Sequence, residues 1–145
     1  MNATTRANLE QALRGEALAA LKYWLFEERA QAEGREEVAD LFGGIGKQER
    51  REHAREIATM LGMPGSTREN LLSSIEGEVD EHRRLYPGFA SMARQSGDIE
   101  AAELFQELGA DEHRHANALR DHLDRLEAAP PTAMVGAAGG TESEV

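Results

Sequence analysis

The sequence contains no cysteine, and this absence excludes several kinds of chemistry. Without thiols the chain cannot form a disulfide, a thiolate zinc site, an iron–sulfur cluster or a thiol nucleophile. Proline is also scarce, since only four of the 145 residues are proline, and Pro130 and Pro131 both lie near the C-terminus. Because proline interrupts helices, its scarcity leaves most of the chain free to be helical.

Long apolar runs and an excess of positive charge are missing as well. No segment approaches the roughly 20 apolar residues of a membrane span, and the N-terminus lacks the apolar core of a signal peptide. The formal net charge is −11, which would repel nucleic acid and anionic membrane surfaces, so we expect neither as a partner. We expect a soluble, cytoplasmic protein whose natural small partners are cations.

Apolar residues at helical spacing, separated by glycine and proline, predict an all-α protein with four helices. The third helix opens with a capping-box pattern at Ser66–Glu69, and Pro87 inside it predicts a kink or local break. Residues 1–128 are predicted to form one domain, and the Ala-, Gly- and Pro-rich residues 129–145 a flexible tail. The predicted helices run from Thr5 to Glu33, from just after Gly34 to Leu61, from Ser66 to Gln95, and from Gly97-Asp98 to Glu127.

The second half of the sequence repeats the first. T-R-A-N-L at Thr5–Leu9 recurs 62 residues later as T-R-E-N-L at Thr67–Leu71, and Gly15-Glu16 recurs as Gly77-Glu78. An offset of 63 is needed to map Glu49 onto Glu112. Two copies of a helical hairpin predict a four-helix arrangement with a pseudo-twofold axis.

Each predicted helix carries a glutamate in the middle of its apolar stripe, namely Glu16, Glu49, Glu78 and Glu112. An unpaired buried carboxylate costs several kcal/mol, and four at one level would also repel one another. One or two dications at the centre remove this conflict. Bundles that bind two iron or manganese ions take one Glu from each of two helices and a Glu-x-x-His pair from each of the others. Glu112 and His115 match that pair.

The second helix departs from the pattern, because His53 follows Glu49 by four positions rather than three. The internal repeat places Glu52 in the position of His115, whereas the inward phase of Ile57 favours His53. A π-bulge near residues 43–46 would also shift the register. We favour His53 as the ligand, with Glu52 as the alternative.

The remaining polar aromatic residues are weaker candidates. We expect His113 and His122 to face solvent, and His82, next to a carboxylate, to lie beside the metal ligands. Tyr23 and Tyr86 follow Glu16 and Glu78 by about two turns in each copy. Core packing is the simpler role for these tyrosines, and a hydrogen bond near the metal is the alternative.

Several segments together resemble rubrerythrins of the ferritin-like superfamily, over about residues 5–127. The resemblance implies a ferritin-like four-helix bundle that holds two iron ions, with manganese as an alternative metal. It implies the iron ligands Glu16, Glu49, Glu78, Glu81, Glu112 and His115, with His53 filling the remaining place. Glu81 is the extra carboxylate that distinguishes such sites from plain ferritin centres. The segments are Asn8–Glu16 (N-L-x5-G-E), Gln48–Ala54 (Q-E-R-R-E-H-A), Gly77–His82 (G-E-V-D-E-H), Leu85–Ala90 (L-Y-P-G-F-A) and Asp111–His115 (D-E-H-R-H).

The resemblance also implies a function, the reduction of hydrogen peroxide by a di-iron oxidoreductase. Typical rubrerythrins receive electrons from a Cys-rich rubredoxin domain, and this cysteine-free sequence contains none. We therefore expect a separate electron donor such as a rubredoxin-like protein. One alternative is a ferroxidase that uses oxygen and feeds iron storage or mineralisation. Another is a helical bundle that binds metal without catalysis.

The link between the second and third helices predicts an oligomer. A pseudo-twofold bundle within one chain requires the link to span about 35 Å of helix at 1.5 Å per residue. Residues Gly62–Ser66 reach only about 20 Å when extended. Either the helices run simply up and down, or the bundle is completed by helix exchange. Because the family that the sequence resembles includes exchanged dimers, we predict a helix-exchanged homodimer with two metal sites.

Overall fold

The computed structural model describes residues 1–128, and every regular element in this range is helical. The predicted all-α class is therefore confirmed, whereas the predicted tail at 129–145 lies outside the described residues. The chain divides into two compact units, Met1–Gly65 and a second unit that begins at Ser66. We call them the first and second hairpins. Within residues 1–128, no helix combines the length and the apolar character that a membrane crossing needs.

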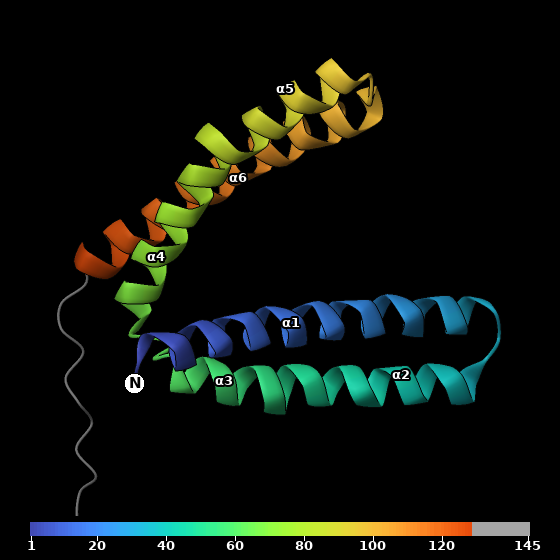
Figure 1. The fold of residues 1–145 in the computed structure, drawn as a ribbon. Coiled ribbons are helices and arrows are strands. Elements are labelled where there is room, and N and C mark those ends of the chain that lie inside the picture. Colours follow the sequence, from blue (N-terminus) through green and yellow to red (C-terminus); the bar gives the residue numbers. More distant parts are fainter. Residues whose placement is uncertain (129–145) are drawn as a thin grey trace, which may run out of the picture. The chain divides into compact units, whose positions relative to one another are not determined.

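The first hairpin pairs one long helix with a second, composite one. Helix α1 spans Ala3–Ala32, and α2 (Glu36–Gln48), the π-helix η1 (Glu49–His53) and α3 (Ala54–Met60) follow one another without a gap. Figure 1 shows α1 lying alongside α2 and α3. Asn2 caps α1 by accepting a hydrogen bond from the Thr5 backbone N–H. Gly34 turns the chain between the two helices with φ of 68°, a conformation that favours glycine.

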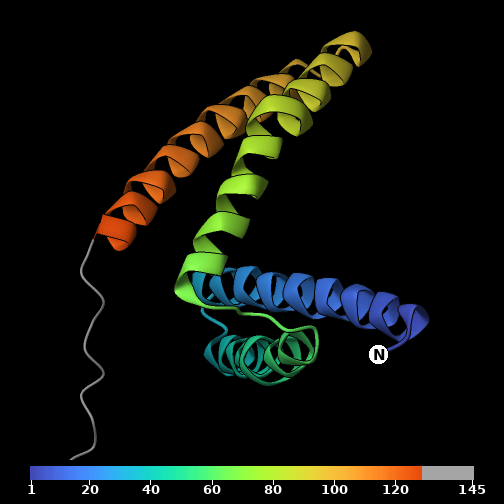
Figure 2. The ribbon, with the colours of Figure 1, turned by 90° about the vertical axis from the view of Figure 1, so that its left-hand side faces the viewer.

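The second hairpin has the same plan with the composite helix first. It consists of α4 (Thr67–Asp80), the π-helix η2 (Glu81–Leu85), α5 (Tyr86–Ser96) and the long α6 (Ile99–Ala128). The predicted capping box is confirmed, with Ser66 and Glu69 hydrogen-bonded to each other at the start of α4. In Figure 2, α4, η2 and α5 form one unbroken helical rod. The irregularity expected at Pro87 thus takes the form of a π turn just before it.

The two π-helices account for both offsets of the internal repeat. In each, a backbone N–H donates to the carbonyl five residues earlier, from Ala54 to Glu49 and from Tyr86 to Glu81. A π turn accommodates one more residue than an α turn. The offset therefore grows from 62 to 63 across η2 and returns to 62 across η1. The bulge that the sequence suggested near residues 43–46 is wrong in position, because that stretch is regular α-helix.

Small residues hold the helices of each hairpin close together. Among residues 1–128, the buried apolar residues are all alanine: Ala30 and Ala39 in the first hairpin, and Ala90, Ala102 and Ala116 in the second. A Cβ on Gly46 would lie 3.1 Å from the Cβ of Tyr23, and one on Gly109 3.3 Å from that of Tyr86. None of the described large side chains is fully buried. Each hairpin by itself therefore resembles half of a hydrophobic core.

A cluster of three aromatic rings occurs at the same place in each hairpin. In the first, the centroid of Phe26 lies 5.5 Å from that of Phe42, and Tyr23 packs on both. In the second, Phe89 lies 5.4 Å from Phe105, and Tyr86 packs on both. All three pairs are related by the offset of 63, so the repeat seen in the sequence extends to side-chain packing.

Candidate metal centre

Three predicted ligands meet in the first hairpin. Glu16 projects from α1, and Glu49 and His53 project from η1, with one ligand atom of each lying within 4.8 Å of the other two. His53 Nδ1 lies 2.8 Å from Glu49 Oε2 and 3.7 Å from Glu16 Oε2. Two carboxylates and one imidazole thus converge at one point between the helices.

The second hairpin repeats this arrangement. Glu78 on α4 meets Glu112 and His115 on α6, again with ligand atoms within 4.8 Å of one another. His115 Nδ1 lies 2.7 Å from Glu112 Oε2 and 3.5 Å from Glu78 Oε2. These distances match those of the first hairpin to within 0.2 Å. The pseudo-symmetry of the sequence therefore yields two equivalent half-sites.

The π turn η1 reconciles the unequal Glu–His spacings. In α6, His115 follows Glu112 by three positions, which places both side chains on one face of an α-helix. In η1 the wider turn brings residues four apart onto one face, so Glu49 and His53 take up the same relation. Glu52 points elsewhere and accepts a hydrogen bond from Gln48 Nε2 at 3.3 Å. The structure groups His53, and not Glu52, with the two glutamates.

Paired carboxylates dominate the electrostatics of each half-site. A hydrogen bond to Glu49, followed by desolvation, raises the pKa of Glu16. The same hydrogen bond lowers the pKa of Glu49. Glu112 raises the pKa of Glu78 in the same way. The hydrogen bond to Glu49 also raises the pKa of His53. The raised pKa values of Glu16 and Glu78 mean that each pair disfavours two full negative charges, which a bound cation would stabilise.

The half-sites suit a metal ion on their own geometry. Glu78 Oε2 is buried without any hydrogen-bond partner in the described residues, a costly state that a cation would relieve. Carboxylate oxygens and imidazole nitrogens together suit iron and manganese. Each half-site offers three ligands, fewer than these metals usually take. A complete centre would therefore need ligands beyond a single hairpin.

The other candidates lie around the second half-site. Glu81, at the start of η2, is not grouped with the three ligands, but its charge contributes to raising the pKa values of Glu78 and Tyr86. Desolvation is the main cause of the raised pKa of Tyr86, and the charges of Glu112 and Glu78 also contribute. Tyr23 occupies the equivalent position in the first hairpin, where its ring packs on Phe42. Tyr86 is thus a protonated phenol among carboxylates.

The remaining histidines lie outside both half-sites. The half-buried His82 donates from Nδ1 to the carbonyl of Gly109 at 2.7 Å and stacks on His113. His113 and His122 are exposed, as predicted, and His122 donates to the carbonyl of Ala118. Gly46 and Gly109, which admit the two tyrosines, were not recognised from the sequence. The offset of 63 relates them and could have identified them.

Comparison with known proteins gives one consistent result. The sequence model of a family described as Rubrerythrin matches residues 7–123. A putative rubrerythrin of Methanocaldococcus jannaschii is 31% identical, over 85% of this chain and 71% of that protein. Rubrerythrin of Porphyromonas gingivalis is 34% identical, over 77% of this chain and 62% of that protein. Rubrerythrin of Nitratidesulfovibrio vulgaris is 31% identical, over 81% of this chain and 68% of that protein. The chain thus spans between 62% and 71% of the length of these relatives.

Proposed function

Because the chain belongs to the rubrerythrin family, we propose that it is a di-iron oxidoreductase that reduces hydrogen peroxide to water. Membership confirms the resemblance and the ferritin-like class predicted from the sequence. The observation that carries the proposal is the pair of equivalent half-sites, each with two carboxylates and one imidazole. Family proteins bind two iron ions, and two such half-sites provide a ligand set for two ions.

We assign the iron ligands as the six grouped residues and Glu81. Glu81 is included because its charge acts on Glu78 and Tyr86. The same oxygen and nitrogen ligands would accept manganese. The grouped ligands are Glu16, Glu49 and His53 of the first hairpin, and Glu78, Glu112 and His115 of the second.

The reaction H2O2 + 2 H+ + 2 e− → 2 H2O defines what each part supplies. Two ferrous ions held by these residues would supply the two electrons. The carboxylates of Glu16 and Glu78, whose pKa values are raised by the neighbouring glutamates, would balance the charge of the ions. Tyr86 keeps its proton over a wide pH range because its pKa is raised, so it stays a hydrogen-bond donor beside the site. Tyr23, at the equivalent position in the first hairpin, would donate a hydrogen bond beside the first half-site.

The electrons that restore the ferrous state come from a separate protein in this proposal. The chain has no cysteine, so it cannot carry a rubredoxin centre of its own within these 145 residues. A rubredoxin-like carrier is the class of donor that we propose. Ferroxidase activity with oxygen and metal binding without catalysis are the alternatives that the experiment below separates.

We further propose that a bundle is completed between two copies, as a helix-exchanged homodimer. Each hairpin supplies half of the ligands and leaves large apolar side chains such as Leu41 and Leu104 exposed. The link at residues 62–66 is too short for a pseudo-twofold pairing within one chain, because it reaches about 20 Å when extended and would have to span about 35 Å. In this proposal residues 1–128 act as one metal-binding domain.

The test is anaerobic loading with ferrous iron, a metal count, and stopped-flow absorbance after peroxide or oxygen is added separately. We expect about two irons per completed site, oxidised much faster by peroxide than by oxygen, and reducible again by a rubredoxin. Faster oxidation by oxygen, with uptake far beyond two irons, would replace the proposal with ferroxidase activity. Stable iron binding without a response to either oxidant would leave only metal binding.

A further inference from the structure

A groove runs along the second hairpin, between the η2–α5 segment and α6. It has a volume of about 530 Å³ and is lined only by residues of η2, α5 and α6. Small and apolar residues such as Ala90 and Phe105 form one part of the lining, and His82, Arg94 and Gln106 are among its polar residues. None of the proposed metal ligands lines the groove, so a partner bound there would leave those side chains untouched.

The groove carries positive charge and no negative charge. Among the described residues that line it there is no Asp or Glu, although the sequence contains 27 of them. Arg94 is exposed and has no ion-pair partner within residues 1–128. The net charge of −11 repels an anionic partner in general, so such a partner is favoured to approach where the acidic residues are missing.

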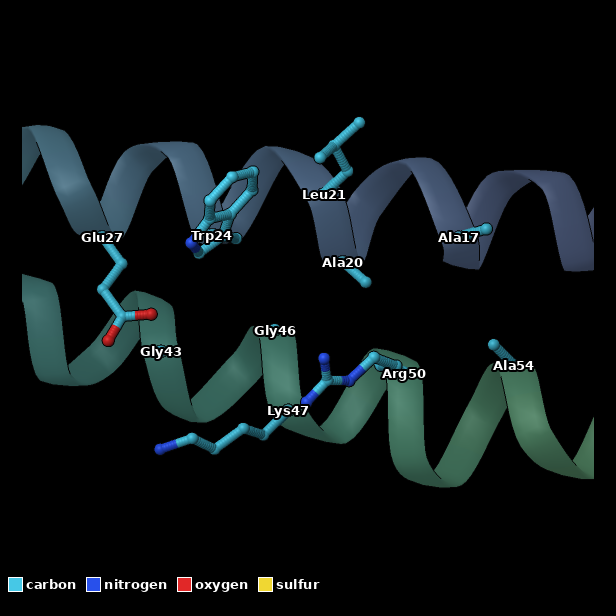
Figure 3. Close-up of a pocket in the computed structure, with 10 residues that line it drawn as sticks. All are labelled: Ala17, Ala20, Leu21, Trp24, Glu27, Gly43, Gly46, Lys47, Arg50 and Ala54. Atoms are coloured by element: carbon cyan, nitrogen blue, oxygen red, sulfur yellow. The ribbon is translucent and has the colours of Figure 1, made fainter. Parts of the chain in front are cut away.

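A groove of nearly the same volume, about 540 Å³, lies at the corresponding place in the first hairpin. Figure 3 shows Trp24 in this groove, with the carboxylate of Glu27 between the two helices and Lys47 and Arg50 on the facing helix. With the offset of 63, Glu27 corresponds to the buried Ala90. The repeat therefore keeps the groove but not its charge. An anionic partner meets a carboxylate in the first groove and none in the second.

A pair of stacked histidines joins the second groove to the second half-site. His82 lines the groove, and its ring centroid lies 4.6 Å from that of His113. The hydrogen bond from His82 to the carbonyl of Gly109 fixes this ring against α6. In sequence His82 directly follows Glu81, and His113 directly follows Glu112. At offsets of 62 and 63 the first hairpin has alanine and arginine instead, so the histidine pair belongs to the second hairpin alone.

We propose that this second groove docks the protein that returns electrons to the half-sites, a small electron carrier with an acidic surface. The inference rests on the proposed function, which requires a separate donor. Complexes between electron-transfer partners are weak and bury less surface than stable dimers do. A single groove with a small apolar floor and a polar rim suits such a brief encounter, whereas a lasting complex with a second copy would need a larger contact.

The histidine pair explains why the carrier docks at this groove and not at the other. Electrons move fastest over short paths through bonded and closely packed atoms. A carrier docked against His82 lies beside a route that leads to Glu81 directly and to Glu112 through the stacked ring of His113. The first groove lacks this route and includes the carboxylate of Glu27.

Two docking events balance one reaction with peroxide. Each reduced carrier gives up one electron and is thereby oxidised. The ferric pair takes up one electron in each event and is ferrous again after the second. These two electrons replace the two that H2O2 consumed. No covalent bond forms or breaks between the proteins, and the two protons of the peroxide reaction come from solvent.

Charge changes in the groove test the docking. A reduced rubredoxin of low isoelectric point serves as the carrier, and stopped-flow absorbance at low ionic strength follows reduction of the peroxide-oxidised protein. Arg94→Glu should lower the second-order rate constant at least about fivefold, because a charge at the rim of an interface acts mainly on the association rate. The nearly isosteric Gln106→Glu adds a carboxylate to the groove and should lower the rate constant at least about twofold. Arg94→Lys keeps the charge and should stay within about twofold of the original.

The matched controls are Lys22→Glu and Gln11→Glu, which make the same charge changes on exposed residues of the first hairpin outside either groove. Reduction by dithionite, which needs no docked protein, is the reference rate for each variant. Equal losses in the groove variants and the controls would overturn the proposal, because net charge alone would then govern the encounter. Unchanged rates with rubredoxin in both Arg94→Glu and Gln106→Glu would overturn it as well.

Docking is also measured without any redox step, because the chain has no cysteine of its own and accepts a single labelled one. Gln106→Cys carrying a benzophenone photo-crosslinker should capture zinc-substituted rubredoxin, which cannot exchange electrons. Gln11→Cys and Lys47→Cys, the latter in the first groove, should not. Capture at Lys47→Cys but not at Gln106→Cys contradicts the docking site. Capture at Gln106→Cys in a protein that peroxide does not oxidise contradicts only the proposed function.

Discussion

At the scale of single residues, the choice between His53 and Glu52 as the third proposed ligand of the first hairpin depends on one turn of backbone. His53 Nδ1 lies among the oxygens of Glu16 and Glu49, whereas Glu52 contacts Gln48. We expect His53→Ala to weaken iron or manganese binding by about tenfold or more. Even the loss of a residue that only hydrogen-bonds to a metal ligand lowers metal affinity about 10–100-fold. Glu52→Gln should leave binding within about twofold. Calorimetric titration with metal measures the affinity of both variants. A larger loss of affinity in Glu52→Gln than in His53→Ala would make Glu52 the ligand.

Two glycines of α2 predict opposite effects of the same substitution. Gly44 has nothing within 4 Å of an added Cβ, so Gly44→Ala should raise the free energy of unfolding by up to about 1 kcal/mol through helix propensity. A Cβ on Gly46 would lie 3.1 Å from the Cβ of Tyr23, so Gly46→Ala should lower the free energy of unfolding by about 1–3 kcal/mol. Thermal unfolding of the metal-free protein measures both. Equal effects would show that α1 and α2 do not require close approach at Gly46.

The carboxylate pairs predict how stability depends on pH. The pKa values of Glu16 and Glu78 are raised above the ordinary 4.5, so their contribution to stability is present below pH 4.5 and is lost as pH rises through the raised values. Glu49 and Glu112 have lowered pKa values, so their contribution to stability is present above pH 4.5 and is lost as pH falls through the lowered values. The metal-free protein should therefore lose stability as pH rises above the ordinary glutamate range. Glu16→Gln with Glu78→Gln should flatten that loss in chemical denaturation, and an unchanged slope would contradict the assignment.

At the scale of elements, the two hairpins are copies that differ by one residue in each π-helix. The extra residue of η1 lies between the proposed ligands Glu49 and His53. Deleting Arg51 should convert η1 to α-helix, with the Glu-x-x-His spacing of α6, and should keep metal binding within about tenfold. Deleting Arg114 from α6 should abolish binding by the second half-site, because it leaves Glu112 and its histidine only two residues apart. Metal counts on the two deletions test this, and equal losses would show that η1 does more than adjust the register.

The internal repeat has two offsets, 62 and 63, and both follow from the π-helices. The change of offset indicated that each copy contains a residue that the other lacks, but the sequence could not place these residues. Hydrogen bonds to the fifth residue back locate them at η1 and η2. The helices, their caps and the glycine turns were predictable because they depend on local sequence. The side on which His53 projects depends on backbone register, which local sequence left open.

At the scale of the whole molecule, the proposed helix exchange predicts that two inactive variants restore each other. One variant carries Glu16→Ala and Glu49→Ala, and the other carries Glu78→Ala and Glu112→Ala. In an exchanged heterodimer one bundle receives both mutated hairpins and the other receives both intact ones. Mixing the variants after partial unfolding should recover up to one complete iron site per two chains. No recovery, with dimers still present by sedimentation, would show that each bundle is built from one chain.

The sequence by itself determined the helical class, the hairpin repeat, the absence of thiol chemistry and the glutamates that the half-sites use, because composition and helical periodicity are local properties. Tertiary structure decided that His53 rather than Glu52 lies with Glu49, how closely Gly46 admits Tyr23, and that Trp24 lies in a groove with Glu27 and Arg50. These features depend on residues far apart in the sequence and on a one-residue change of register. A single extra residue rotates everything that follows it by about 100° unless a π turn absorbs it.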